Sequence, residues 1–348
     1  MKKAVIFGGG KNYHKLKKHI PVFFNVEIIA IVDNSITIQG SSVDGFNVIP
    51  PKKLNYIEYD VIIVTPIKPK EIISQLNEMG VSAEKIEIIP QELQYCVEIE
   101  SYIEFENKQI LEVGCGNGSL LKAIAKIYNP EFITGIDPSL SQWWGVGESK
   151  GDNWCIIDGN VEALEFDNNK FDAVISIVAF EHIKDIDKAL QEIKRVLKPS
   201  GRFYATVSPP WTSVVGHHFA SDKWNPQNVP LIPPWGHLYM TEDEIREHAI
   251  KEGANHNLAN ELVDFIFHSD IINRISRFDF ICNIVNSGMT ICNFNEHMAF
   301  SRYWWNDYQP MENELTQEIL DNISKTKYKP TDLGVLAFTV VLEKYADF

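Results

Sequence analysis

Short, continuous runs of apolar residues recur along the N-terminal part of the chain, with mixed polar and apolar stretches between them. Such runs predict buried strands, and they fall at Ala4–Phe7, Ile28–Val32, Val61–Val64 and Ile86–Ile89. Helices are predicted over Asn12–Ile20 and Pro69–Met79. Apolar strands that alternate with helices are typical of a parallel sheet covered on both faces. We therefore predict an α/β domain over residues 1–95, followed by a connection over 96–107.

A second and more regular series of apolar runs begins after this connection. Its predicted strands are Ile110–Val113, Phe132–Ile136, Trp154–Ile157, Ala173–Ile177 and Arg202–Val207. The clearest helix is predicted over Ile183–Leu197, where apolar residues recur at three- and four-residue spacing. Two later runs, Met289–Phe294 and Val335–Glu343, can add strands to the same sheet. This pattern predicts a second α/β domain over residues 108–348.

The alternation breaks directly after the fifth strand of this second series. Residues 209–240 hold six of the 17 prolines, three of the eight tryptophans and three of the ten histidines. A polar, helix-like stretch then runs from Thr241 to about Asn286. The carboxyl end of a strand in an open α/β sheet faces the ligand crevice, and long irregular segments there often act as lids or binding loops. We predict a substrate-loop, or lid, insertion at about 209–286.

Composition and charge exclude several classes of protein. A net charge of −15 repels nucleic-acid phosphates, so no nucleic-acid partner is expected. The five cysteines are scattered and form no CxxC pair, which fits a reducing compartment and predicts no structural zinc site. The first apolar run is too short for a signal peptide, and no stretch of 18 apolar residues is present to span a membrane. The expected location is the cytoplasm.

A glycine-rich turn follows the first strand of the second series. Gly114, Gly116 and Gly118 lie between that strand, which contains Glu112, and a predicted helix. Glycine lets a backbone turn tightly and approach a ligand closely. Asp137 ends the next strand about 20 residues further on, where an acid can accept hydrogen bonds from ribose hydroxyls. The alternative role for Asp137 is a helix cap.

Further short motifs follow in order along the second series. Asp158, Gly159 and Asn160 end the third strand, and Glu181 and His182 follow the fourth. Together with the glycine turn, this ordered set closely resembles the class I S-adenosylmethionine-dependent methyltransferase family over roughly residues 108–208.

This resemblance implies a fold, a cofactor and a set of contacts. The fold is α/β, with two Rossmann-like units in series, of which the second is a seven-stranded class I methyltransferase sheet with a reversed final hairpin. The cofactor is S-adenosylmethionine. Gly114 and Gly116 would pass its methionine part, Glu112 would organise the loop, Asp137 would bind the ribose and Asp158 would meet the adenine amine. The implied cofactor-binding residues are Glu112, Gly114, Cys115, Gly116, Gly118, Asp137, Pro138, Asp158, Gly159, Asn160 and Ile177.

The first domain carries a simpler glycine turn. Gly8 and Gly10 follow its first strand, and Asp33 follows its second. Asn12 and Tyr13 occupy the region of the third glycine of a dinucleotide fingerprint, which argues against NAD. The layout is similar to the small N-terminal domains of bacterial sugar-modifying enzymes, which implies binding of a nucleotide-linked sugar at Gly8, Gly10 and Asp33. The alternative is a structural or dimerising domain, so a homodimer is left open.

Histidines and tryptophans supply the candidate catalytic and substrate-binding residues. Histidine can accept a proton from a hydroxyl nucleophile, and the candidates are His217, His218 and His237 in the insertion, with His182 as a further one. The alternative for these side chains is packing and loop hydrogen bonding. No metal is expected, because no paired carboxylate pattern accompanies the three insertion histidines.

Aromatic faces suit the apolar C–H face of a sugar, and the candidates in the insertion are Trp211 and Trp235. The adjacent pair Trp143 and Trp144 is instead expected in the core or at an interface. The predicted function is therefore S-adenosylmethionine-dependent O-methylation of a sugar, a nucleotide-sugar or a surface-polysaccharide component. Two alternatives remain: methylation of another small polar acceptor, such as a phosphate-linked group or an amine, and a non-catalytic cofactor-binding regulatory protein.

Overall fold

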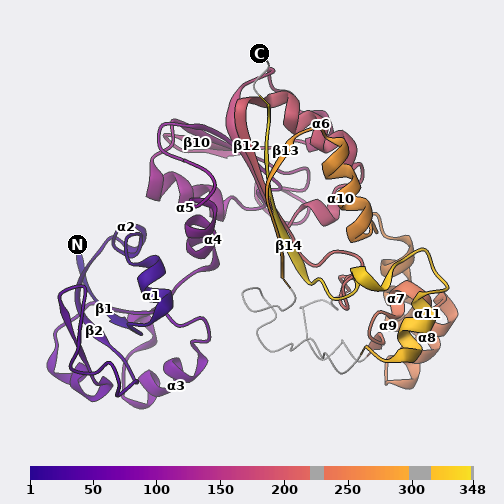
Figure 1. Cartoon of the computed structure of the whole chain (residues 1–348). Coiled ribbons are helices and arrows are strands. Elements are labelled where there is room, and N and C mark those ends of the chain that lie inside the picture. Colours follow the sequence, from indigo (N-terminus) through magenta and orange to yellow (C-terminus); the bar gives the residue numbers. More distant parts are fainter. Residues whose placement is uncertain (220–230, 298–314, 346–348) are drawn as a thin grey trace. The chain divides into compact units, whose positions relative to one another are not determined.

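The computed structural model describes residues 1–219, 231–297 and 315–345 (Figure 1). These residues form two compact units. The first unit comprises Met1–Asn107, Gly118–Phe132 and Asp152–Trp154, and the second comprises the other described residues. Within the described ranges, no helix is both long and apolar enough to cross a membrane.

The first unit contains a six-stranded sheet with the order β3-β4-β2-β1-β5-β6. Its strands are β1 (Lys2–Phe7), β2 (Val26–Val32), β3 (Ser42–Val43), β4 (Phe46–Ile49), β5 (Val61–Val64) and β6 (Ile86–Ile88). Strand β1 is parallel to β2 and β5, and β5 is parallel to β6, as expected for apolar strands separated by helices. The β3–β4 hairpin is not apparent from the sequence, because strands of two and four residues leave too short a pattern.

Helices cover both faces of this sheet. They are α1 (Lys11–Leu16), α2 (Ile20–Phe24), α3 (Lys70–Glu78) and α4 (Gln91–Ile99), with the 3-10 turns η1 (Pro51–Tyr56) and η2 (Ala83–Lys85). Alternate residues of β1 enter two separate apolar clusters. Ala4 and Ile6 pack with residues of α1, α2 and α4, while Val5 and Phe7 pack with residues of η1 and α3. Both faces of β1 are therefore buried in apolar clusters.

The helix expected over Asn12–Ile20 is split into α1 and α2. Pro21 lies at the start of α2, a position that suits a residue without a backbone N–H, so a new helix begins there. The helix expected over Pro69–Met79 is confirmed as α3.

Helix α5 (Ser119–Tyr128) belongs to the first unit, although it directly follows the glycine turn of the second predicted domain. It packs against α2 and α4. The Lys126 amine donates a hydrogen bond to the Phe23 carbonyl oxygen, and the Tyr128 hydroxyl donates one to the Glu100 carboxylate at 2.8 Å. A boundary at residue 108 therefore removes the helices against which α5 packs.

We expect a fragment of residues 108–348 to be less stable than a fragment of residues 91–348. The longer fragment keeps α4 and its packing against α5, and the shorter one leaves part of α5 bare. Loss of packing of this kind costs roughly 1–3 kcal/mol, which corresponds to a melting temperature lower by roughly 2–8 °C. Thermal unfolding of the full chain and both fragments measures the difference. Identical melting curves for the two fragments would show that α4 does not support α5.

The second unit is built on an eight-stranded mixed sheet with the order β13-β14-β12-β11-β7-β8-β10-β9. Its strands are β7 (Gln109–Val113), β8 (Phe132–Ile136), β9 (Ser149–Lys150), β10 (Trp154–Ile157), β11 (Phe171–Ile177), β12 (Leu197–Val207), β13 (Thr290–His297) and β14 (Ala337–Glu343). Strand β11 is parallel to β7 and β12, whereas β14 is antiparallel to β12 and β13. The reversed final hairpin is therefore present. The sheet exceeds the seven expected strands because the two-residue β9 pairs with β10.

Helices of the second unit pack on this sheet and beyond it. They are α6 (Ile186–Val196), α7 (Gly236–Tyr239), α8 (Glu242–Lys251), α9 (His256–Val263), α10 (Arg277–Asn286) and α11 (Gln317–Ile323), with the turns η3 (Val161–Ala163), η4 (Phe180–His182), η6 (Asp264–His268) and η7 (Pro330–Asp332). Helices α6 and α10 lie side by side (Figure 1). Helix α6 starts later than expected, because the Asp185 side chain caps it by accepting a hydrogen bond from the Lys188 backbone N–H at 3.0 Å.

The predicted insertion after β12 contains helices α7 to α10, and part of it packs with α11 and neighbouring C-terminal residues in a separate apolar cluster. The cluster includes Trp211, Trp235 and Ile245, and residues of α8, α9 and α11 pack within it. Residues 220–230 of the predicted insertion lie outside the described ranges. We call the apolar cluster that contains Trp211, Trp235 and Ile245 the insertion core. Its residues alternate with polar ones at helical spacing, which is why the sequence predicts helices there.

Candidate active site

The turn after β7 adopts backbone angles that favour glycine. Gly114 and Gly116 have φ angles of +70° and +54°, and a β-carbon at Gly114 would lie 2.4 Å from the Ala179 side chain. The Gly114 and Cys115 backbone N–H groups donate to the Ile136 carbonyl oxygen at 2.9 and 3.0 Å. Larger residues cannot fit here without moving β11 or its following turn, so the sequence requires glycine at these positions.

Asp137 holds this turn from the end of β8. One carboxylate oxygen accepts a hydrogen bond from the Gly116 backbone N–H at 3.0 Å, and the other accepts one from the Ser139 N–H at 2.8 Å. The side chain is buried. Asp137 is thus a structural partner of the glycine turn as well as the predicted ribose acceptor. Pro138, next to it, is exposed.

Trp144 lies against the same turn. A β-carbon at Gly116 would lie 2.9 Å from the Trp144 indole, and the Trp143 and Trp144 side chains are 58% and 48% exposed. The pair is therefore not in the core, and the alternative expectation, that it lies at an interface, stays a prediction. The sequence offered no signal for the contact, because the loop between β8 and β9 has no periodic pattern.

The remaining predicted cofactor residues lie at the ends of β10 and β11. Asp158 is exposed, Gly159 packs closely on Ile136, and the Asn160 side chain caps η3 by accepting from the Glu162 N–H at 2.8 Å. Ile177 ends β11 and is half-buried. The next residue, Val178, has a φ of +52°, which is strained for a β-branched side chain. Strain of this kind commonly accompanies functional sites.

Glu181 and His182 form the short turn η4 directly after this strained residue. Glu181 is 2% exposed, and burial raises the pKa of its carboxyl to about 8, although the backbone N–H of Ser208 donates to it. His182 is exposed, and its Nδ1 lies 2.8 Å from the Ile271 carbonyl oxygen. The surrounding chain still desolvates the ring and lowers its pKa, while the Ile271 hydrogen bond and the charge of Asp137 act in the opposite direction.

Asn273 holds η4 in place. Its side-chain amide donates hydrogen bonds to the Phe180 and Ile183 carbonyl oxygens at 2.8 and 2.9 Å, and its backbone N–H donates to the Glu181 carbonyl oxygen at 3.0 Å. This residue comes from the irregular segment before α10. Sequence reasoning missed it because no motif or periodicity marks that segment.

The three histidines of the insertion are all buried. His217, His218 and His237 are 4%, 8% and 4% exposed. The Phe219 backbone N–H donates to Nδ1 of His217 at 3.1 Å, and Nε2 of His237 lies 2.8 Å from the Trp211 carbonyl oxygen. Of the four histidines predicted as bases, only His182 is exposed. The three others lie in packed surroundings, because the insertion packs with α11 and neighbouring residues into an apolar cluster.

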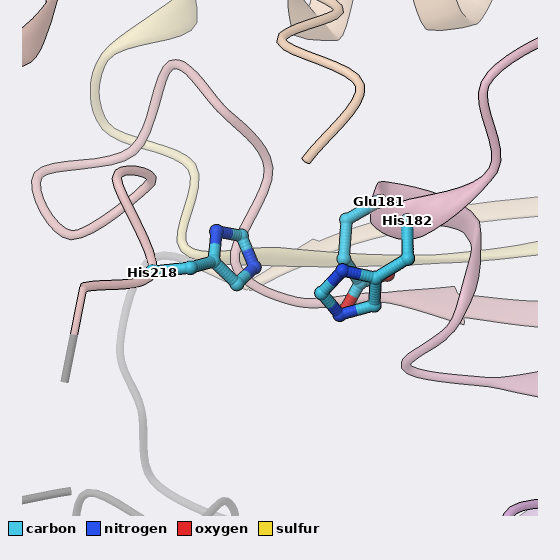
Figure 2. A group of neighbouring side chains, drawn as sticks. All are labelled: Glu181, His182 and His218. Carbon is cyan, nitrogen blue, oxygen red and sulfur yellow. The ribbon is translucent and has the colours of Figure 1, made fainter. Parts of the chain in front are cut away.

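Glu181, His182 and His218 come together although they lie on separate segments. Each offers a ligand atom within 4.8 Å of the others, and the two imidazole centroids are 5.3 Å apart. Figure 2 shows the His182 and His218 rings turned towards one another, with the Glu181 carboxylate beside them. His218, like Val178, has a φ of +52°. We call these three residues the Glu181 cluster.

Trp211 and Trp235, predicted to face a substrate, lie in the insertion core instead. They are 4% and 6% exposed, and the Trp211 indole N–H donates to the Tyr328 hydroxyl at 2.8 Å. At these two positions the free energy gained by burying a large aromatic ring favours packing over an exposed position.

The buried His237 should make folding stability depend on pH. Burial lowers the pKa of His237 from 6.5 to about 4, so between these values the unfolded chain binds more protons than the folded chain. Stability should therefore fall as pH drops from about 6.5 to about 4, by at most about 3–4 kcal/mol for this residue. Urea unfolding at several pH values measures the slope.

The matched variant for this measurement is His237→Gln, whose amide can still donate to the Trp211 carbonyl oxygen but cannot titrate. Its stability should vary less steeply over the same pH range. Parallel curves for the variant and the natural chain would show that His237 is protonated equally in both states.

The first unit repeats the Asp137 arrangement on its own glycine turn. One Asp33 carboxylate oxygen accepts from the Gly9 backbone N–H at 2.8 Å and the other accepts from the Ser35 N–H at 2.7 Å. Gly8 has a φ of +104°, and a β-carbon there would lie 2.7 Å from Thr65 and Pro66. Gly10 caps α1, and a β-carbon there would contact no atom within 4 Å. Both units thus join an acid after the second strand to the turn after the first.

Comparison with known proteins finds a match for each part of the chain. Residues 111–205 match a family model described as a methyltransferase domain, and this match spans the glycine turn, Asp137 and the Glu181–His182 pair. This segment is therefore similar to methyltransferase domains. Residues 1–87 match a model described as C2185-like, N-terminal.

Relatives of the methyltransferase domain act on different acceptors. A fatty-acid O-methyltransferase of Mycolicibacterium smegmatis is 31% identical over 117 residues, which cover 31% of this chain and 39% of that protein. The ubiquinone/menaquinone biosynthesis C-methyltransferase UbiE of Hahella chejuensis is 31% identical over 145 residues, which cover 39% of this chain and 55% of that protein. The chain thus spans about half the length, or less, of these curated relatives.

Among solved structures, an S-adenosylmethionine-dependent methyltransferase from Mesorhizobium loti is similar to this chain with a TM-score of 0.43 and 13% identity. The match covers 73% of this chain and 98% of that one.

Proposed function

We propose that the protein transfers a methyl group from S-adenosylmethionine to an oxygen of a small polar acceptor. The observation that carries this proposal is the Asp137 carboxylate hydrogen-bonded to Gly116 within the methyltransferase domain. It supports a preformed turn at the place where the class binds its cofactor. Gly114 and Gly116 would pass the methionine part and Glu112 would organise the turn, with Asp137 at the ribose and Asp158 at the adenine. Trp144, partly exposed beside Gly116, would cover the same turn.

In this reaction the acceptor oxygen attacks the methyl carbon and the carbon–sulfur bond of the sulfonium breaks. The products are S-adenosylhomocysteine and a methyl ether, and the hydroxyl proton passes to a base. Among the candidate histidines, His182 suits this role best. It is the exposed member of the Glu181 cluster, and the charge of Asp137 acts to raise its pKa. Its Nδ1 faces the Ile271 carbonyl, so that nitrogen carries the proton and Nε2 keeps a lone pair. Positioning of the reactants supplies much of the rate.

The acceptor we propose is a sugar or nucleotide-linked sugar of a surface polysaccharide. The support is the first unit, where Asp33 holds Gly9 in the same way as Asp137 holds Gly116. An acid and a glycine turn at this place suit a nucleotide. The Trp211 and Trp235 indoles are not part of this proposal, because both are buried in the insertion core.

Two other functions stay as alternatives. The first is methylation of another small polar acceptor, such as a phosphate-linked group or an amine. The names of the relatives, a fatty-acid O-methyltransferase and a ubiquinone/menaquinone biosynthesis C-methyltransferase, favour an acceptor other than a sugar. A cofactor-binding protein without turnover is the second alternative. The burial of three of the four candidate histidines is the observation that favours it.

A methyl-release assay on the full chain distinguishes these functions. Purified protein is incubated with radiolabelled S-adenosylmethionine and, separately, with nucleotide-sugars, fatty acids, quinols and amines. We expect transfer to a nucleotide-sugar, and expect the Asp33→Ala variant to lose affinity for it while keeping cofactor affinity. Transfer to a different acceptor would overturn the sugar assignment, and cofactor binding without transfer to any acceptor would favour the regulatory alternative.

A further inference from the structure

The two imidazoles of the Glu181 cluster have their hydrogen-bonding roles set by backbone carbonyls. Nδ1 of His182 lies 2.8 Å from the Ile271 carbonyl oxygen, and Nδ1 of His218 lies 2.7 Å from the Gly216 carbonyl oxygen. A carbonyl oxygen only accepts, so both Nδ1 atoms carry the hydrogen. The lone pair of each neutral ring is therefore on Nε2.

These lone pairs and a carboxylate face the same small space. Nε2 of His218 and one carboxylate oxygen of Glu181 are buried and have no hydrogen-bond partner among the described residues. A buried acceptor without a partner costs free energy. A positive charge or a donor between these groups would satisfy them, and either the proton of the Glu181 carboxyl itself or a bound cation can supply it.

We propose that Glu181, His182 and His218 bind one divalent transition-metal ion, through a carboxylate oxygen and the two Nε2 atoms. Two histidines and one glutamate are a ligand set that zinc uses when one position remains for water or substrate. Imidazole nitrogens favour such ions over Mg²⁺ and Ca²⁺, which take oxygen ligands.

The spacing fits this assignment. Two imidazoles on a tetrahedral zinc ion have ring centres roughly 5 Å apart, and the rings of His182 and His218 have centroids 5.3 Å apart with an interplanar angle of 69°. The ligand atoms lie within 4.8 Å of one another, so a small rotation of the side chains closes them on one ion.

Each ligand also has an outer partner that orients it. The Ile271 and Gly216 carbonyls hold the two rings, and the Ser208 backbone N–H holds the second oxygen of Glu181 at 3.4 Å. Outer hydrogen bonds of this kind are the rule around metal-binding histidines. The sequence did not reveal the site, because the carboxylate follows β11 while His218 lies in the insertion.

The metal site is not part of the proposed function, and metal binding can be measured without an assay of methyl transfer. Three protein ligands leave a position for water or an acceptor oxygen. With the ion bound, Nε2 of His182 is a ligand and cannot also accept the acceptor's proton, so the base role proposed for His182 applies to the protein without the ion.

The test uses the untagged full chain, freed of metal with a chelator and titrated with Zn²⁺ by calorimetry. We expect one equivalent to bind tightly, and Zn²⁺ to raise the melting temperature. Glu181→Gln and His182→Asn should each weaken Zn²⁺ binding by more than roughly 100-fold, since even outer partners contribute roughly 10- to 100-fold. His256→Asn, which changes an exposed histidine of α9, is the matched control and should bind as the natural chain does.

Co²⁺ provides a second measurement, because its visible spectrum reports nitrogen ligation directly. We expect the spectrum of the natural chain to be lost in His182→Asn, whose exposed position favours a folded variant. Binding of no Zn²⁺, Zn²⁺ binding that is unchanged in Glu181→Gln, or Mg²⁺ binding as tight as Zn²⁺ binding would each overturn the proposal. If no ion binds, a proton or a water molecule occupies the cluster instead.

Discussion

Replacing Asp137 by alanine should weaken S-adenosylmethionine binding by about 1–3 kcal/mol, or roughly 5- to 150-fold in Kd. The carboxylate holds the Gly116 and Ser139 backbone N–H groups at 3.0 and 2.8 Å. The variant leaves both donors without this acceptor and also removes the proposed partner of the ribose hydroxyls. The glycine turn should lose its shape as the cofactor loses a contact. Calorimetric titration of the full chain with S-adenosylmethionine measures the change.

One further variant keeps an acceptor oxygen at position 137 without the negative charge, and another serves as a control. Asp137→Asn keeps one acceptor oxygen, so its affinity should lie between those of the natural chain and the alanine variant. Asp187→Ala removes an exposed acid from the first turn of α6 and should leave Kd unchanged. A folded Asp137→Ala protein with unchanged affinity would remove Asp137 from the cofactor site.

Replacing His182 by alanine should slow turnover by roughly 100- to 10,000-fold, the usual effect of losing a positioned acid or base. Cofactor affinity should change little, because the ring hydrogen-bonds to Ile271 and not to the glycine turn. The rate is measured with the acceptor found in the methyl-release assay, and Kd is measured by titration. A lower turnover rate with nearly unchanged cofactor affinity indicates a residue that acts on the methyl acceptor and not on the cofactor.

The controls compare histidines of different surroundings. His256→Ala, at an exposed position, should leave both rate and stability unchanged. His217→Ala should lower the melting temperature and change the turnover rate only modestly, because this ring is buried. Turnover at the natural rate in His182→Ala would show that the proton leaves by another route.

The strands and the order of motifs could be predicted because their signals are local. A run such as Val61–Val64 is apolar over its whole length, and it forms a buried strand wherever a sheet covers both faces. The glycine turn and Asp137 are likewise marked by residue types whose backbone freedom or charge is needed at one place. The β3–β4 hairpin and β9 could not be predicted, since two residues carry no period.

Side-chain surroundings could not be predicted in the same way. Trp144 was expected in the core or at an interface and is 48% exposed, whereas Trp235 was expected to face a substrate and is buried. Aromatic composition alone does not distinguish these outcomes, because it says nothing of which segments pack over a ring. The membership of α5 in the first unit is a similar case, since its partners are helices earlier in the chain.

The α/β class, the parallel strands, the glycine turn and the acid that follows it could be predicted from residue patterns along the chain. Only the folded chain shows that Asp137 holds Gly116, that His217 and His237 are buried, and that Glu181 and His182 meet His218. Strand and turn propensities act between near neighbours in the chain. Burial, pKa and ligand geometry depend instead on which distant segments the sheet and the insertion bring together.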